Sequence, residues 1–216
     1  MNSLTTPPLS TFLAKLFADA EETTALRQRT VTPQQRAAAA AQTDYKKMYT
    51  DLKDFHIAVS PETGSLLYML ARSARAKSIV EFGTSFAIST LHMAAALRDN
   101  GGGRLITSEF VPSKVAAARQ NIAQAGFSDL VDVREGDALE TLGRDLPDAI
   151  DLVLLDGAKP LYPKVLALLE GRLRSGAFVL ADNADWCPEY LAYVRSAANG
   201  YLSVPFGGDV ELSMRM

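Results

Sequence analysis

The sequence predicts an α/β fold built on a doubly wound, mostly parallel sheet. From about residue 60 onward, short apolar runs alternate with helix-forming segments, which is the pattern of strand–helix–strand units. The apolar runs are nearly continuous, as expected for strands that are buried on both faces. At the end of the chain, Gly207 and Gly208 separate two short runs and predict an antiparallel hairpin.

The first 58 residues predict an N-terminal helical extension. Apolar residues recur at helical spacing over residues 9–17, and Ser10 is the candidate cap of this first helix. A second helix is expected to start at Thr32, which precedes a proline, and to continue through the alanine run 37–41 to Leu52.

The main domain is expected over residues 59–216, with its elements in a regular order. Strands are predicted at residues 77–83, 103–109, 130–136, 149–156 and 176–183. Helices are predicted at residues 60–74, 88–100, 111–126, 162–173 and 189–199. With the terminal hairpin at residues 201–216, the expected sheet has seven strands.

The composition of the chain excludes several functional classes. The 216 residues are 48% hydrophobic and carry a net charge of −3, so there is no basic surface typical of nucleic-acid binding. The lone Cys187 excludes a disulfide framework, and the only histidines, His56 and His92, argue against a zinc site. The chain has no signal-peptide pattern and no apolar run near the length of a membrane span, so we expect a cytoplasmic protein.

Acidic and amide side chains recur where the predicted strands end. Ligands of doubly wound sheets bind beyond the carboxyl ends of the strands. The side chains at these ends are those of Glu81, Glu109, Asp137, Asp156, Asp182 and Asn183. We therefore expect the functional site at this edge of the sheet.

The loop after the first strand favours a nucleoside ligand without phosphates. Gly83 stands alone, whereas dinucleotide and nucleotide-triphosphate sites need several glycines at fixed spacing. Glu109 ends the next strand, where an acid accepts hydrogen bonds from ribose hydroxyls and repels a 2′-phosphate. Ser89 lies near a helix start, which favours a carboxylate. S-adenosylmethionine fits these features better than NADP, with an ordinary tight turn as the alternative for Gly83.

Six segments in a fixed order resemble one enzyme family. They are SPETG, VEFGTSFAIST, SEFVPSK, EGDA, LLDGAKPLY and LADNADW. Together they resemble the class I S-adenosylmethionine-dependent O-methyltransferases of the catechol and caffeoyl-coenzyme A type, over roughly residues 55–216. The resemblance implies a Rossmann-like fold, an O-methyltransferase activity, a homodimer and a divalent metal, Mg²⁺ or else Mn²⁺ or Ca²⁺.

The resemblance also assigns roles to individual residues. The implied cofactor-binding residues are Val59, Ser60, Glu81, Gly83, Ser85, Ser89, Glu109, Phe110, Gly136, Asp137, Ala138 and Asp156. Among them, Ser89 would hold the methionine carboxylate, Glu109 the ribose, and Asp137 would line the adenine. The implied metal ligands are Asp156, Asp182 and Asn183, and Lys159 is the implied general base.

The chemistry of methyl transfer to a hydroxyl explains why these residue types are needed. Mg²⁺ prefers hard oxygen ligands and lowers the pKa of oxygens bound to it. A nearby cation should also lower the pKa of Lys159, so that this lysine can accept a proton. The expected acceptor is a small catechol-like aromatic.

Several alternatives remain open from the sequence. Asp182 and Asn183 could cap the helix near Pro188, Asp156 could cap the helix that follows it, and Lys159 could be solvated. Ala87 replaces a glycine common in the family, and the loop with Pro160 departs from the family pattern, which leaves the acceptor open. A metal-independent or non-catechol methyltransferase, or a non-catalytic protein that binds S-adenosylmethionine, would also fit.

Overall fold

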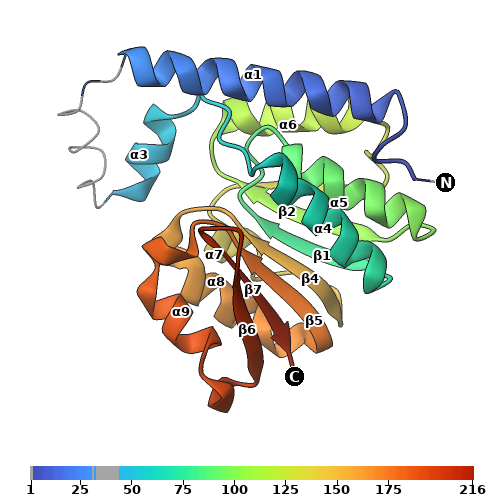
Figure 1. The fold of residues 1–216 in the computed structure, drawn as a ribbon, viewed down its shortest axis with the longest axis vertical. Helices are drawn as coiled ribbons and strands as arrows, with labels where there is room; N and C mark the ends of the chain where they lie inside the picture. The colour runs from blue at the N-terminus through green and yellow to red at the C-terminus, as the bar shows by residue number, and fades with distance from the viewer. Residues whose placement is uncertain (1, 31, 33–43) are drawn as a thin grey trace.

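The computed structural model describes residues 2–30, 32 and 44–216 and is organised around one seven-stranded sheet (Figure 1). The strands are β1 (Ser78–Phe82), β2 (Arg104–Glu109), β3 (Val131–Glu135), β4 (Ile150–Leu155), β5 (Leu173–Ala181), β6 (Tyr201–Phe206) and β7 (Val210–Arg215). Their order is β3-β2-β1-β4-β5-β7-β6. The first five run parallel, and β7 is antiparallel to both of its neighbours. The predicted fold class is confirmed, including the terminal hairpin.

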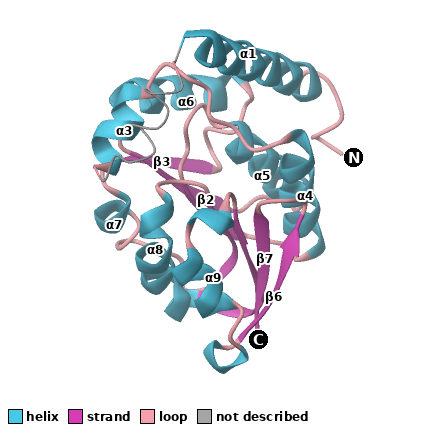
Figure 2. Cartoon of the chain, turned by 60° about the vertical axis from the view of Figure 1, so that its left-hand side comes forward, coloured by secondary structure: helices cyan, strands magenta, loops and turns pink. Residues whose placement is uncertain are grey.

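Helices cover both faces of the sheet (Figure 2). They are α1 (Leu9–Thr30), α3 (Tyr45–Asp51), α4 (Pro61–Ser73), α5 (Ile88–Asp99), α6 (Pro112–Gln124), α7 (Ala138–Thr141), α8 (Tyr162–Leu169) and α9 (Pro188–Val194). Residues of α1, α4, α5 and α6 form the hydrophobic core on one face. Residues of α7, α8 and α9 form the core on the other face.

Helix α5 lies at the centre of the first core. Its residues from Ile88 to Leu97 are all buried, and its small alanine side chains allow the neighbouring helices α1 and α4 to approach closely. His92 is 4% exposed and bonds the Ile88 carbonyl through Nδ1, with its ring against Phe17. This histidine is therefore a packing residue.

The N-terminal predictions need correction. Helix α1 begins at Leu9, so Ser10 lies inside the helix and does not cap it. The predicted helix through residues 37–41 falls outside the described residues. The last part of the predicted helix is described, and there helix α3 begins at Tyr45. Asp44 has an extended backbone, and its carboxylate accepts the N–H of Lys47 as an N-cap.

The structure excludes the capping alternatives for the acidic strand ends. Helix α9 is preceded by Cys187, so neither Asp182 nor Asn183 caps it. Asn183 precedes the 3₁₀ turn Ala184–Trp186 and forms no side-chain capping bond there. The short 3₁₀ turn after β4 starts beyond Asp156, with Ala158 at its cap position. Among the residues that the structure describes, no helix combines the length and the apolar composition needed to cross a membrane.

Candidate functional site

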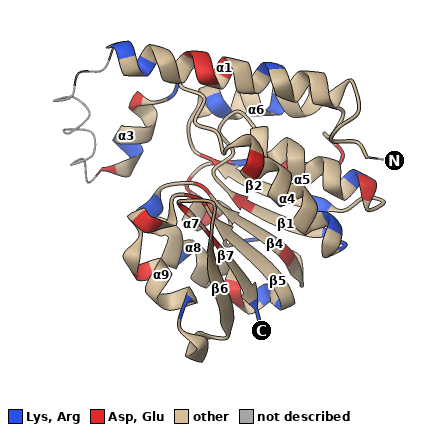
Figure 3. Cartoon of the chain, viewed as in Figure 1, with Lys and Arg blue, Asp and Glu red and all other residues tan. Residues whose placement is uncertain are grey.

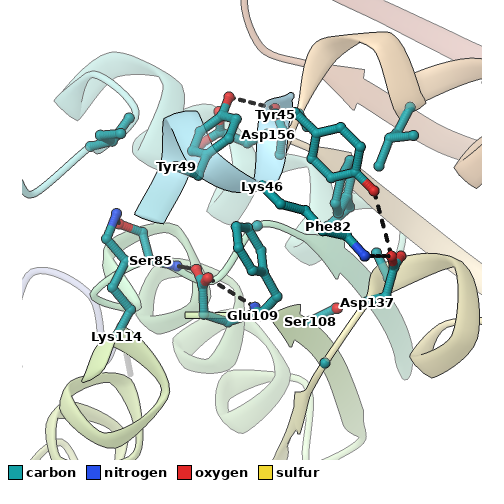
Figure 4. Close-up of a pocket in the computed structure, with 18 residues that line it drawn as sticks. Tyr45, Lys46, Tyr49, Phe82, Ser85, Ser108, Glu109, Lys114, Asp137 and Asp156 are labelled. Carbon is teal, nitrogen blue, oxygen red and sulfur yellow. Dashed lines mark hydrogen bonds and ion pairs between the residues drawn. The ribbon is translucent and has the colours of Figure 1, made fainter. Parts of the chain in front are cut away.

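A pocket lies at the carboxyl ends of strands β1 to β4 and beneath helix α3 (Figure 4). The loops after the four parallel strands form its floor, and α3 and α6 contribute its walls. Its lining residues are Tyr45, Lys46, Tyr49, Ile57, Phe82, Gly83, Ser85, Ser108, Glu109, Phe110, Lys114, Gly136, Asp137, Ala138, Asp156, Gly157, Ala158 and Leu161. This is the edge at which parallel sheets bind ligands, and acidic positions gather there (Figure 3).

Glu109 is held rigidly at the centre of the pocket. One carboxylate oxygen accepts the N–H of Ser85 at 3.0 Å, and the other accepts the N–H groups of Phe110 and Val111, each at 2.9 Å. The side chain is buried, yet it lines the pocket. A carboxylate has about four acceptor positions, and three of them are occupied here, so Glu109 has about one position left, on the oxygen bonded to Ser85, for a ligand hydroxyl.

Two glycines allow the backbones of the β1 and β4 loops to approach each other closely. A Cβ atom on Gly83 would lie 2.7 Å from the Asp156 carbonyl oxygen, and the φ angle of Gly83 is +106°. A Cβ atom on Gly157 would lie 2.4 Å from the ring of Phe82. These contacts fix the position of Asp156 relative to the first loop.

Helix α3 contacts the pocket through polar side chains (Figure 4). The Lys46 ammonium forms an ion pair with Asp137 at 2.7 Å, and the Tyr45 hydroxyl donates to the same carboxylate at 3.5 Å. The Tyr49 hydroxyl donates to the Gly157 carbonyl at 3.3 Å. The bond from Lys46 holds the pKa of Asp137 below its usual range despite partial burial.

An acidic corner forms where β4 and β5 end side by side. The Lys159 ammonium lies 3.1 Å from Asp156 Oδ1. Burial, together with the charge of Asp156, raises the pKa of Asp182 to about 7. Two carboxylates crowded in this way repel each other, and a bound cation would relieve that repulsion.

Lys159 is buried and not solvated, which excludes the sequence alternative. Burial lowers the pKa of its ammonium, but the charges of Asp156, Tyr49 and Asp182 outweigh this effect, so the pKa is raised overall. The fall in pKa expected from the sequence therefore depends on the charge of a bound cation and not on the protein alone.

Asn183 completes the donor set of this corner. Its backbone is in the left-handed region, and the NH₂ group of its side chain donates a hydrogen bond to Asp209 at 2.6 Å. The amide oxygen is therefore available to bind a metal ion. In the described part of the chain, no group of three or more His, Cys, Asp or Glu side chains is arranged to hold a metal. A metal here would use two carboxylates and an amide, which is a donor set that suits Mg²⁺.

Glu81 is fully buried behind the pocket. Its two carboxylate oxygens accept the hydroxyls of Ser89 and Thr90, each at 2.5 Å. Burial raises the pKa of Glu81 to about 7, although these hydrogen bonds act in the opposite direction. Ser89, the expected partner of the methionine carboxylate, thus donates its hydroxyl to Glu81 and does not line the pocket.

This raised pKa predicts how stability depends on pH. Because the folded state binds the Glu81 proton more tightly than the unfolded state, the free energy of unfolding should fall as the pH rises from about 4.5 to about 7. The contribution of Glu81 is roughly 1.4 kcal/mol per pH unit at most. Glu81→Gln should remove it, as measured by urea unfolding at several pH values.

The control for that experiment is Glu62→Gln, since Glu62 is exposed on α4. Asp182 also has a raised pKa and is present in every protein compared, so the difference between Glu81→Gln and wild type isolates Glu81. Identical pH profiles for wild type and Glu81→Gln would contradict the assignment.

The structure brings eight of the predicted site residues into the pocket. They are Gly83, Ser85, Glu109, Phe110, Gly136, Asp137, Ala138 and Asp156. Lys159, Asp182 and Asn183 adjoin it at the acidic corner. Val59 and Ser60 do not line it, and the Ser60 hydroxyl caps α4 through the N–H of Thr63.

Five polar pocket residues were not expected from the sequence: Tyr45, Lys46, Tyr49, Ser108 and Lys114. Ser108 and Lys114 lie in the segment SEFVPSK, and the other three lie in the helix expected to end at Leu52. Trp186 is 71% exposed and does not line the pocket. Cys187 is buried.

Comparisons with known proteins show which family this chain resembles. The family model described as O-methyltransferase matches residues 38–199. A catechol O-methyltransferase from Niastella koreensis is 38% identical over 59% of this chain and 58% of its own length. Catechol O-methyltransferase B from Danio rerio is 35% identical over 74% of this chain and 62% of its own length. The chain therefore spans less than two thirds of the length of these curated relatives.

A solved structure extends the similarity to nearly the whole chain. The O-methyltransferase TomG from Streptomyces achromogenes, in complex with S-adenosylmethionine, has a TM-score of 0.65 and 25% sequence identity. The similarity covers 93% of this chain and 98% of the TomG chain. The matched part is therefore larger than the 59% and 74% of this chain that the two curated relatives cover.

Proposed function

The chain belongs to the O-methyltransferase family, and from this membership we propose that it is a divalent-metal-dependent O-methyltransferase. In this proposal it moves a methyl group from S-adenosylmethionine to a hydroxyl of a small catechol-like aromatic. One observation carries the proposal. A rigidly held acid suited to ribose, Glu109, shares a pocket with Asp156, which belongs to an acidic corner suited to a cation.

The nucleoside would lie across the centre of the pocket. Glu109 would accept a hydrogen bond from the ribose, and Asp137 with Gly136 and Ala138 would line the adenine. Gly83 would permit close approach of the cofactor to the backbone of the first loop. Bound there, S-adenosylmethionine supplies the electrophilic methyl group.

The metal and acceptor would lie at the acidic corner. Asp156, Asp182 and Asn183 would hold Mg²⁺, or else Mn²⁺ or Ca²⁺, which would lower the pKa of acceptor hydroxyls bound to it. Lys159 lies beside Asp156 and would accept the hydroxyl proton as the general base. The names of the relatives, catechol O-methyltransferases, support a catechol-like acceptor.

The N-terminal extension, residues 1–58, would act as a cap on a methyltransferase domain formed by residues 59–216. The contacts of α3 with Asp137 and Gly157 support this role, because they hold the helix directly over the pocket. We further propose that the protein is cytoplasmic and forms a homodimer. Sedimentation of the purified protein would test the dimer.

Calorimetry and a methyl-transfer assay test the proposed activity. We expect S-adenosylmethionine to bind, and caffeic acid and simple catechols to be methylated in the presence of Mg²⁺. A chelator should abolish turnover, because an acceptor oxygen without a metal keeps its normal pKa, and added Mg²⁺ should restore it.

Two outcomes would contradict parts of this proposal. Turnover that survives the chelator would indicate a metal-independent enzyme. Cofactor binding without turnover on any diphenol would indicate a different acceptor or a non-catalytic protein.

A further inference from the structure

The pocket contains a buried cation to which no role has yet been given. Lys114 belongs to the first turn of α6, is 3% exposed and lines the pocket. Its ammonium lies 3.4 Å from the Ser85 hydroxyl and 5.7 Å from the centre of the Phe86 ring. In Figure 4 the side chain extends from α6 toward Ser85.

Lys114 forms no ion pair with any carboxylate in the described part of the chain, unlike the pocket's other cation, Lys46. Two of the three nearby acids are engaged elsewhere. Glu109 accepts backbone N–H groups with both oxygens, and Asp156 is paired with Lys159, whereas the third acid, Asp54, is exposed at the surface. Burial lowers the pKa of Lys114, even though the charges of Glu109, Asp156 and Asp54 act in the opposite direction.

A buried ammonium without a counter-ion is unfavourable for the folded protein, and buried charges are normally paired. Such a group is explained if a ligand supplies the opposite charge. This inference rests on the proposed function, in which the ligand is S-adenosylmethionine. The anionic group of that cofactor is its α-carboxylate.

The order of the charged groups across the pocket matches the order of groups in the cofactor. Asp137 lies at one end, Glu109 in the middle, and Lys114 with Ser85 at the other end (Figure 4). An adenine at Asp137 and a ribose at Glu109 place the amino-acid end of the cofactor toward Lys114. Ser89, the alternative partner, is bonded to Glu81 behind the pocket.

We propose that the Lys114 ammonium, assisted by the Ser85 hydroxyl, binds the α-carboxylate of S-adenosylmethionine. Hydrogen bonds between charged groups typically contribute about 10- to 100-fold in affinity. Lys114 would then be a cofactor-binding residue that lies outside the implied set.

The test compares two ligands that differ at the amino-acid end. S-adenosylhomocysteine has the carboxylate, whereas 5′-methylthioadenosine has the same adenine, ribose and sulfur but no amino-acid end. Lys114→Met should weaken binding of the first by about 10- to 100-fold and leave binding of the second unchanged, as measured by calorimetry. Lys164→Met, at an exposed position on α8, is the matched control and should change neither affinity.

Stability gives a second readout. Because Lys114→Met removes a buried unpaired charge, its melting temperature in the absence of ligand should equal or exceed that of wild type. Lys114→Gln, which removes the charge but keeps a polar group, should show the same ligand dependence. If neither variant folds, the proposal is overturned. It assumes that the unpaired charge of Lys114 destabilises the folded protein, and a residue of that kind cannot be needed for folding.

The outcomes separate this inference from the proposed function. If wild-type protein binds neither ligand, the proposed function fails. Suppose that wild type binds both ligands and that Lys114→Met lowers the two affinities equally, or lowers neither. The assignment of Lys114 then fails and the proposed function stands.

Discussion

Replacing Lys159 with Met is expected to lower kcat for methyl transfer by about 10²- to 10⁴-fold, the usual contribution of a general base. The affinity for S-adenosylmethionine should change little, because Lys159 adjoins the pocket through Asp156 and does not line it. Steady-state rates on a catechol acceptor, together with calorimetry of the cofactor, measure the two effects separately. Lys164→Met is again the matched control.

A second variant separates the proton-accepting role from an electrostatic one. Lys159→Met removes one partner of a buried ion pair, which typically costs about 3–5 kcal/mol of stability, so the folded fraction must be measured. Lys159→Arg keeps the positive charge beside Asp156, but its guanidinium does not give up a proton. An active Lys159→Arg enzyme would show that the lysine acts through its charge and is not the base.

The fold could be predicted from the sequence because its signals are local. Strands β1, β2, β4 and β5 each contain a short apolar run, β3 alternates valines with charged residues, and the terminal hairpin has glycines at its turn. The residues that follow these strands converge because parallel strands end at the same edge of a sheet. For this reason the sequence alone predicts that Glu109, Asp137 and Asp156 lie at one site, and all three line the pocket.

The rest of the site depends on contacts between segments that are far apart in the sequence. Tyr45 bonds Asp137, 92 residues later, and the pattern of α3 alone indicates only a helix with one packed face. Likewise, nothing near Lys114 indicates burial, since the α6 segment reads as an ordinary surface helix. Ser89 donates its hydroxyl to Glu81 because the Glu81 side chain points away from the pocket into the core.

The Ser10 cap was wrong for a local reason. The turn at residues 3–8 already leads into the helix, and the N–H of Ser10 bonds the Thr6 carbonyl. The cap position therefore lies before Ser10. A polar residue followed by an apolar stripe locates a helix better than it locates the first residue of that helix.

Gly83→Ala is expected to destabilise the protein by roughly 2–5 kcal/mol and to reduce cofactor binding. Its backbone angle disfavours a side chain, and the added methyl would lie 2.7 Å from the Asp156 carbonyl oxygen. The loops after β1 and β4 would have to separate, and this would displace Asp156 from its position in the proposed site. Urea unfolding measures the first effect, and calorimetry with S-adenosylhomocysteine measures the second.

Gly126→Ala separates the steric clash from the backbone effect. Gly126 follows α6 with a φ angle of +76°, and no atom lies within 4 Å of the Cβ position. Its replacement should cost only the backbone penalty, roughly 1–2 kcal/mol, and should leave cofactor binding unchanged. If Gly83→Ala were no more damaging than Gly126→Ala, the two loops would be free to move apart. The close approach of Gly83 to Asp156 would then not be what positions the acidic corner relative to the cofactor.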